Sequence, residues 1–140
     1  MSARGSPVKG MLFGVAVDIG GTLLAGITLG ILWSIWLAAS GVSAEQIEEA
    51  TRNPDPTSPV SIASYAIGTA FSVLGGYVCA RVARETEYRC AAVVAAISIA
   101  FGFVAGGGPT FAMSVLMVAT TLAAVMFGAW LGKRLNQSPA

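Results

Sequence analysis

The sequence predicts an all-α membrane protein, with four transmembrane helices in an antiparallel bundle and both termini in the cytoplasm. Apolar residues make up 55% of its 140 residues and charged residues only 11%, whereas an ordinary soluble domain has about 25% charged residues. The apolar residues form four runs of membrane-spanning length. Seven of the eight Lys and Arg residues then fall on one side of the membrane, as the positive-inside rule requires.

The same composition argues against several functions. The net charge is only +1, which gives no case for a nucleic-acid partner. The chain has no histidine and only two cysteines, so a catalytic triad would lack its usual base and a metal site would lack ligands. We therefore expect no enzyme activity, no metal and no cofactor. The two cysteines are expected to be reduced and structural.

The first span is predicted over residues 11–39. The apolar run from Gly10 to Ser40 is broken only by Asp18, and it is too long for a secretory signal core of about 7–15 residues. It also exceeds the ~20 residues that cross a bilayer. Residues 10–17 therefore either lie along the interface or continue a tilted helix. Asp18 lies either at the inner boundary or inside the membrane.

A polar connector follows, from residue 41 to 59. Ser43 followed by Glu45, Glu48 and Glu49 predicts a short capped amphipathic helix over about 43–52, outside the cell. Asn53 and the prolines after it end that helix. We interpret the segment as a solvated connector, with a binding lid as the alternative.

The second span, residues 60–81, carries a stripe of small residues at every fourth position. They are Ser64, Gly68, Ser72, Gly76 and Ala80. Such a stripe lets another helix backbone approach closely. The sequence therefore predicts the central helix-packing surface here, with room for a ligand path as the alternative.

The third and fourth spans are predicted over residues 89–106 and 109–132. Three glycines and a proline at 106–109 predict a tight reversal between them. The fourth span repeats the small-residue spacing, and we place Gly128 in a helix-packing contact. The chain is short enough for a single domain, residues 1–140.

Asp18 is the most informative side chain, because ionisable residues within a span usually face a partner or a water-filled path. Counting inward from the outer ends of their spans places Asp18 and Arg81 at a similar depth. The two either form an ion pair, or Asp18 acts alone as a proton carrier.

The segment Asp18-Ile19-Gly20-Gly21-Thr22 resembles the first-helix segment of the small multidrug-resistance transporters, whose acidic residue also leads into Gly-Thr. That resemblance implies exchange of protons for cationic substrates through Asp18. This chain departs from the family in having aspartate for glutamate, a long acidic loop and a fixed charge bias. The same five residues resemble the DxGGT phosphate element of actin-like sugar kinases, but 140 residues leave no space for that fold.

These observations predict a small, non-catalytic, multi-pass protein of the bacterial inner membrane. Its partners are the lipid bilayer and either further copies of itself, as a homo-oligomer, or a larger membrane complex of which it is an accessory subunit. The alternative is a small proton- or cation-coupled transporter that uses Asp18, with a small-molecule substrate that the sequence does not identify.

Overall fold

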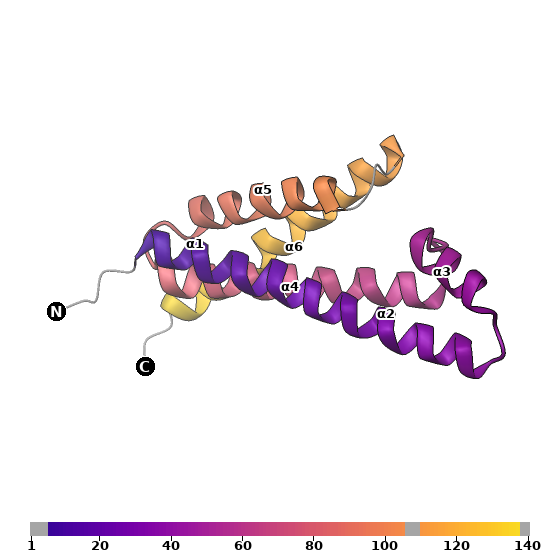
Figure 1. Cartoon of the computed structure of the whole chain (residues 1–140). Coiled ribbons are helices and arrows are strands. Elements are labelled where there is room, and N and C mark those ends of the chain that lie inside the picture. The colour runs from indigo at the N-terminus through magenta and orange to yellow at the C-terminus, as the bar shows by residue number, and fades with distance from the viewer. Residues whose placement is uncertain (1–5, 106–109, 138–140) are drawn as a thin grey trace.

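The computed structural model describes residues 6–105 and 110–137, in which all regular structure is helical. The elements are α1 (Pro7–Val15), the π-helical turn η1 (Ala16–Gly20), α2 (Gly21–Ala39), α3 (Ala44–Arg52), α4 (Pro59–Ala83), α5 (Glu87–Ala105) and α6 (Phe111–Gln137) (Figure 1). Four helices are long and apolar enough to cross a membrane: α4, α5, α6 and the continuous helix Pro7–Ala39. The predicted all-α class is confirmed, and the number of helices able to span a membrane by length and composition agrees with the four expected.

Serine caps and prolines set the starts of two spans. Ser6 accepts a hydrogen bond from the Lys9 N–H and is followed by Pro7, and Ser58 accepts one from the Ser61 N–H before Pro59. Both pairs match the residues preferred at helix starts. The first helix therefore begins before residue 11, and residues 10–17 continue it. The reversal predicted at 106–109 lies outside the described residues.

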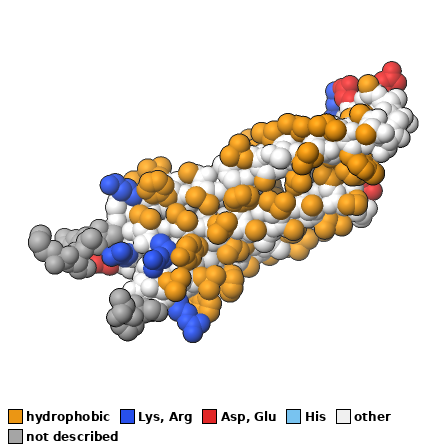
Figure 2. All heavy atoms as spheres, turned by 90° about the horizontal axis from the view of Figure 1, so that it is seen from below, with side chains coloured by type: hydrophobic (Ala, Val, Ile, Leu, Met, Phe, Trp, Pro, Cys, Tyr) orange, Lys and Arg blue, Asp and Glu red, His pale blue; other side chains and the backbone are white. Residues whose placement is uncertain are grey.

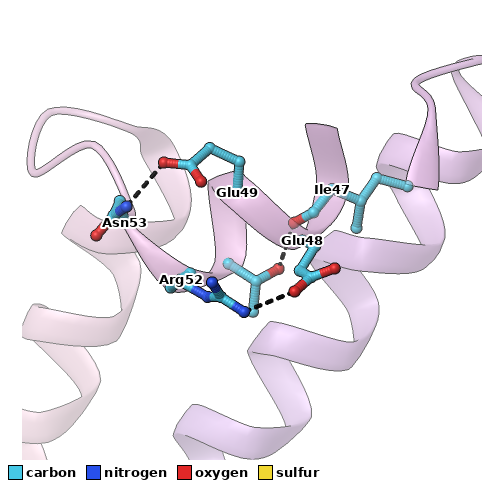
Figure 3. A network of polar contacts seen from close by, with 6 residues as sticks. Ile47, Glu48, Glu49, Arg52 and Asn53 are labelled. Carbon is cyan, nitrogen blue, oxygen red and sulfur yellow. Dashed lines mark hydrogen bonds and ion pairs between the residues drawn. The ribbon is translucent and has the colours of Figure 1, made fainter. Parts of the chain in front are cut away.

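The short helix α3 is held by local contacts. Ser43 and Gln46 form a capping box, Arg52 pairs with Glu48 at 2.7 Å, and the Asn53 amide donates to Glu49 (Figure 3). None of its residues is buried, and exposed pairs of this kind stabilise a helix only slightly. The predicted amphipathic helix is present, and it lies at one end of the molecule (Figure 1).

Helix α4 is the centre of the bundle and contacts α1, η1, α2, α5 and α6. We call the end where α1 begins and α6 ends the terminal end, and the end that carries α3 the loop end (Figure 1). The buried apolar core lies toward the terminal end and consists mainly of small side chains. Its members are Cys79, Ala80, Ala83, Cys90, Ala91, Val94, Ala95, Val125 and Ala129.

The surface has the pattern that a bilayer requires. On the face shown in Figure 2, hydrophobic side chains cover the middle of the molecule, while charged side chains gather at its two ends. Many large apolar side chains are exposed, among them Leu24 and Phe111. In water such a surface would be an association site, whereas lipid solvates it along its whole length.

Candidate functional site

Asp18 is a buried acidic side chain that lies well inside the first membrane-spanning helix, whereas the buried Glu87 is the first residue of α5. Asp18 is only 3% exposed and lies in the π-helical turn η1, where the backbone passes from α1 into α2 without leaving helical dihedral angles. A π turn holds one residue more than the α-helical turn it replaces, and such turns occur frequently at functional sites. Here the turn presents a carboxyl group to α4 and α5.

Two serine hydroxyls from different helices hold this carboxyl group. Ser72 of α4 donates to Oδ1 at 2.8 Å, and Ser98 of α5 donates to Oδ2 at 2.5 Å. Each carboxyl oxygen therefore has one neutral donor. Hydrogen bonds to a buried carboxyl group replace part of its lost hydration, but hydroxyl donors add no compensating positive charge.

Arg81 does not supply that charge. Its guanidinium donates to the Asn136 side chain at 3.1 Å, and the Asn136 amide donates to the Ala80 carbonyl at 3.0 Å. Asp18 is level with Gly75, where an added Cβ would lie 2.8 Å from the Asp18 Cβ. Arg81 lies six residues further along α4, or about 9 Å at 1.5 Å per residue. Counting residues placed the two side chains too near each other in depth, because it treated the outer ends of the two helices as level. Asp18 lies 21 residues before Ala39, the end of α2, whereas Gly75 lies only 16 residues after Pro59, the start of α4.

Part of the predicted small-residue stripe is a close helix-packing surface. At Gly76 an added Cβ would run into the Val125 backbone, and at Gly128 into the Val73 backbone. At Gly132 it would lie 2.8 Å from both the Tyr77 carbonyl oxygen and the Ala80 Cβ. Helices α4 and α6 thus touch backbone to backbone, as small residues in membrane helices allow.

The other part of the stripe has a different role. An added Cβ at Gly68 would meet only the Thr22 Cγ2, at an ordinary contact distance of 3.5 Å. Gly68 and Ser64 line a cavity instead of a helix contact. These two residues therefore border open space, whereas Gly76 lies in a helix contact.

The cavity extends from Asp18 toward the loop end and has a volume of about 360 Å³, within the range of small-molecule sites. All four spans contribute to its walls. Among the described residues, the polar side chains that line it are Asp18, Thr22, Ser64, Tyr65, Thr69, Ser72, Ser98, Thr120 and Thr121, and the apolar ones include Ile19, Leu23, Phe101 and Met117. The Tyr65 hydroxyl lies 2.5 Å from the Thr120 hydroxyl and links α4 to α6 beside the cavity.

This arrangement is suited to holding a positively charged group. One carboxyl group lies at the inner end of the cavity, and hydroxyl and aromatic side chains form its walls. No basic residue lines the described part of the cavity. The described residues contain no cluster of three His, Cys, Asp or Glu side chains that could hold a metal ion.

Several residues of the site were missed at the sequence level. Ser98 is the single serine or threonine of α5, and a polar side chain within an alanine-rich span was the available signal. In the first helix, small or polar residues also recur at every fourth position, and Asp18 is one of them. The full set is Gly10, Gly14, Asp18, Thr22, Gly26, Gly30 and Ser34. That spacing already indicated that Asp18 belongs to the face that approaches α4.

The helices and the buried site define a small multi-pass membrane protein with an intramembrane carboxyl group at the end of a cavity. No family model matches this chain, and no curated protein or solved structure is significantly similar to it. Its function is therefore argued from its own residues.

Proposed function

We propose that the protein is a small membrane transporter in which Asp18 alternately binds a proton and a small cation. The observation that carries this proposal is a carboxyl group, 3% exposed, that has two hydroxyl donors and, within residues 6–105 and 110–137, no cationic partner. Intramembrane acids of this kind are costly to bury and mark proton or ion pathways. A buried acid with a purely structural role would be expected to have a basic partner. The ion pair with Arg81 that the sequence allowed would have been such a partner.

The charge pattern supports a definite orientation for this transporter. With the terminal end in the cytoplasm of a bacterial cell, seven of the eight basic residues lie inside and only Arg52 lies outside. The cavity then opens toward the outer face of the inner membrane, while the packed terminal end closes the inner side. Reporter fusions after residues 4, 87 and 140 should read cytoplasmic, and fusions within residues 45–55 should read external. A cytoplasmic signal from residues 45–55 would contradict this orientation.

Reconstitution tests the role of Asp18. In liposomes with an imposed pH gradient, the wild-type protein should let protons move down that gradient while a small organic cation such as ethylammonium moves in the opposite direction. Asp18→Asn keeps the shape of the side chain but cannot exchange a proton, so flux should fall to the level of empty liposomes. Asp55→Asn, which alters an exposed acid outside the spans, is the matched control and should leave flux unchanged. Equal flux in Asp18→Asn and wild type would contradict the proposal.

A non-catalytic structural role is the second candidate, in which the chain packs as a homo-oligomer or as an accessory subunit. It is supported by α2, in which no residue is buried, so that a second chain could cover this helix. The mass of the purified protein in detergent, measured together with anything that co-purifies from the native membrane, tests it. A bare monomer would contradict it.

A further inference from the structure

We propose that the Asp18 site takes a single-chain amphiphile with a protonated amine as its head group. The head lies in the cavity against Asp18, and the apolar chain lies in a groove along α2. The head-group half of this inference rests on the transporter function proposed above. The chain half rests on a separate feature of the fold.

That feature is a groove on the exposed face of α2. It has a volume of about 640 Å³. We call it the α2 groove and define it by its lining residues, Thr22, Leu23, Gly26, Ile27, Gly30, Ile31, Ser34 and Ile35, with Thr51 of α3 at one end. An added Cβ at Gly26 or at Gly30 would meet nothing within 4 Å. The two glycines therefore form an open floor, beside a ridge of leucine and isoleucine side chains.

The α2 groove adjoins the Asp18 cavity. Thr22 and Leu23 line both spaces, so the head group and the chain of the proposed ligand would lie on either side of the same two residues. From Thr22 to Ser34 the groove is about 18 Å long at 1.5 Å per residue. This is close to the hydrocarbon depth of one leaflet, about half of the ~30 Å core. The groove therefore has the length and polarity of an extended alkyl chain.

Charge complementarity selects the head group. Asp18 is the only charged residue among those that line the cavity and the groove in the described chain, so a monovalent cation balances it. An amine also has N–H donors for the hydroxyl oxygens around it. An inorganic cation would leave the groove unused. A lipid chain alone would leave the carboxyl group without a counter-charge.

A chain-length series in nanodiscs tests this inference. The probes are n-alkylammonium ions from ethyl to dodecyl, with n-alkanols of equal length as neutral counterparts. Binding is measured by calorimetry after subtraction of partition into empty nanodiscs. The variants are Gly26→Leu and Gly30→Leu, which add bulk to the groove at positions where a Cβ has open space. Thr28→Leu adds similar bulk at an exposed position of α2 that does not line the groove and is the matched control.

We expect affinity to rise with chain length in the wild type and in Thr28→Leu. In Gly26→Leu, binding of dodecylammonium should weaken by about tenfold while binding of ethylammonium stays unchanged. At each chain length, the dissociation constant of the variant is divided by that of the wild type. This ratio removes the general affinity of the alkyl chain for lipid, which is the same for both proteins. That ratio is the quantity that reports on the groove.

Four results would overturn the inference. If Gly26→Leu changes the affinity of all chain lengths equally, the groove does not hold the chain. If alkanols bind as tightly as alkylammonium ions, the groove holds an ordinary lipid chain. If the wild type is a dimer and Gly26→Leu a monomer, a second copy covers the groove. If no alkylammonium ion binds at any length, the transporter function fails as well, whereas the first three results leave it standing.

Discussion

The two ends of the bundle use the same kind of sequence in opposite ways. Toward the terminal end, Gly76 and Gly128 bring α4 and α6 into backbone contact, and the core residues there are fully enclosed. Toward the loop end, Gly68 lies on the same stripe of α4 but faces a cavity, and Figure 1 shows α5 and α6 diverging from α2 and α4. A small residue thus permits close approach, but whether a neighbouring helix makes that approach depends on the paths of the other helices.

The largest expected difference between the two ends is in glycine substitution. Gly128→Ala forces a Cβ into the Val73 backbone and should cost about 1–3 kcal/mol of unfolding free energy, as for other overpacked sites. Gly68→Ala has space for its Cβ and should be neutral or stabilising by up to ~1 kcal/mol, because alanine is the better helix former. Reversible unfolding in detergent measures both. Equal losses would mean that the loop end is as closely packed as the terminal end.

The second prediction compares two serines of the same stripe. Ser72→Ala removes the donor to Asp18 Oδ1 and should cost about 1–3 kcal/mol, since a buried acceptor loses its partner. Ser64→Ala changes a side chain that lines the cavity and should cost less. Unfolding free energies in the same detergent decide between them. A smaller cost for Ser72→Ala would show that solvent reaches the carboxyl group in the wild type.

A double-mutant cycle on Asp18 and Arg81 tests whether the two ends are independent. Their side chains have separate partners, Ser72 and Ser98 for Asp18 and Asn136 for Arg81. The effects of Asp18→Asn and Arg81→Gln should therefore add to within about 0.5 kcal/mol. A larger coupling energy would mean that Asp18 and Arg81 interact, in agreement with the ion pair that the sequence allowed.

The smallest expected effect lies outside the membrane, in the turn before α4. The Thr57 backbone N–H and then its hydroxyl donate to Asp55, and these hydrogen bonds lower the pKa of Asp55 below its ordinary value of 3.8. These hydrogen bonds therefore stabilise the turn at pH values above the pKa that Asp55 has in the unfolded chain. The stabilisation is lost as the pH falls through the lower pKa of the folded state. Thr57→Val keeps the N–H and loses the hydroxyl, so the Asp55 pKa should rise only part of the way. A full return to 3.8 in an NMR titration would show that the hydroxyl dominates.

The fold could be predicted from the sequence because the features that determine it are local. Apolar run length, Ser-Pro helix starts and the Ser43 cap each act within a few residues. These signals need no knowledge of the neighbouring helices.

The site could be predicted only in part, because it depends on relative depth and on which helix faces which. Asp18 was identified as the key side chain, but its partners come from α4 and α5, far along the chain. Counting residues from the outer ends gave Asp18 and Arg81 a similar depth, since it assumed that the outer ends of their two helices are level. Similarly, the residues next to Gly68 and Gly76 in the sequence do not distinguish the two glycines. Gly68 lines a cavity and Gly76 lies in a packing contact only because α5 and α6 diverge from α4 toward the loop end.

The π-helical turn η1 has a consequence for insertions and deletions in this chain. A π turn holds one residue more than the α-helical turn it replaces, so loss of one residue within Ala16–Gly20 would return the turn to a regular α-helix and leave the orientation of α2 nearly unchanged. An inserted residue would act differently, because one residue in an α-helix corresponds to a rotation of about 100°. The close approach of Gly10 and Gly14 to α4 would stay in place, while the residues of α2 that line the Asp18 cavity would turn away from it.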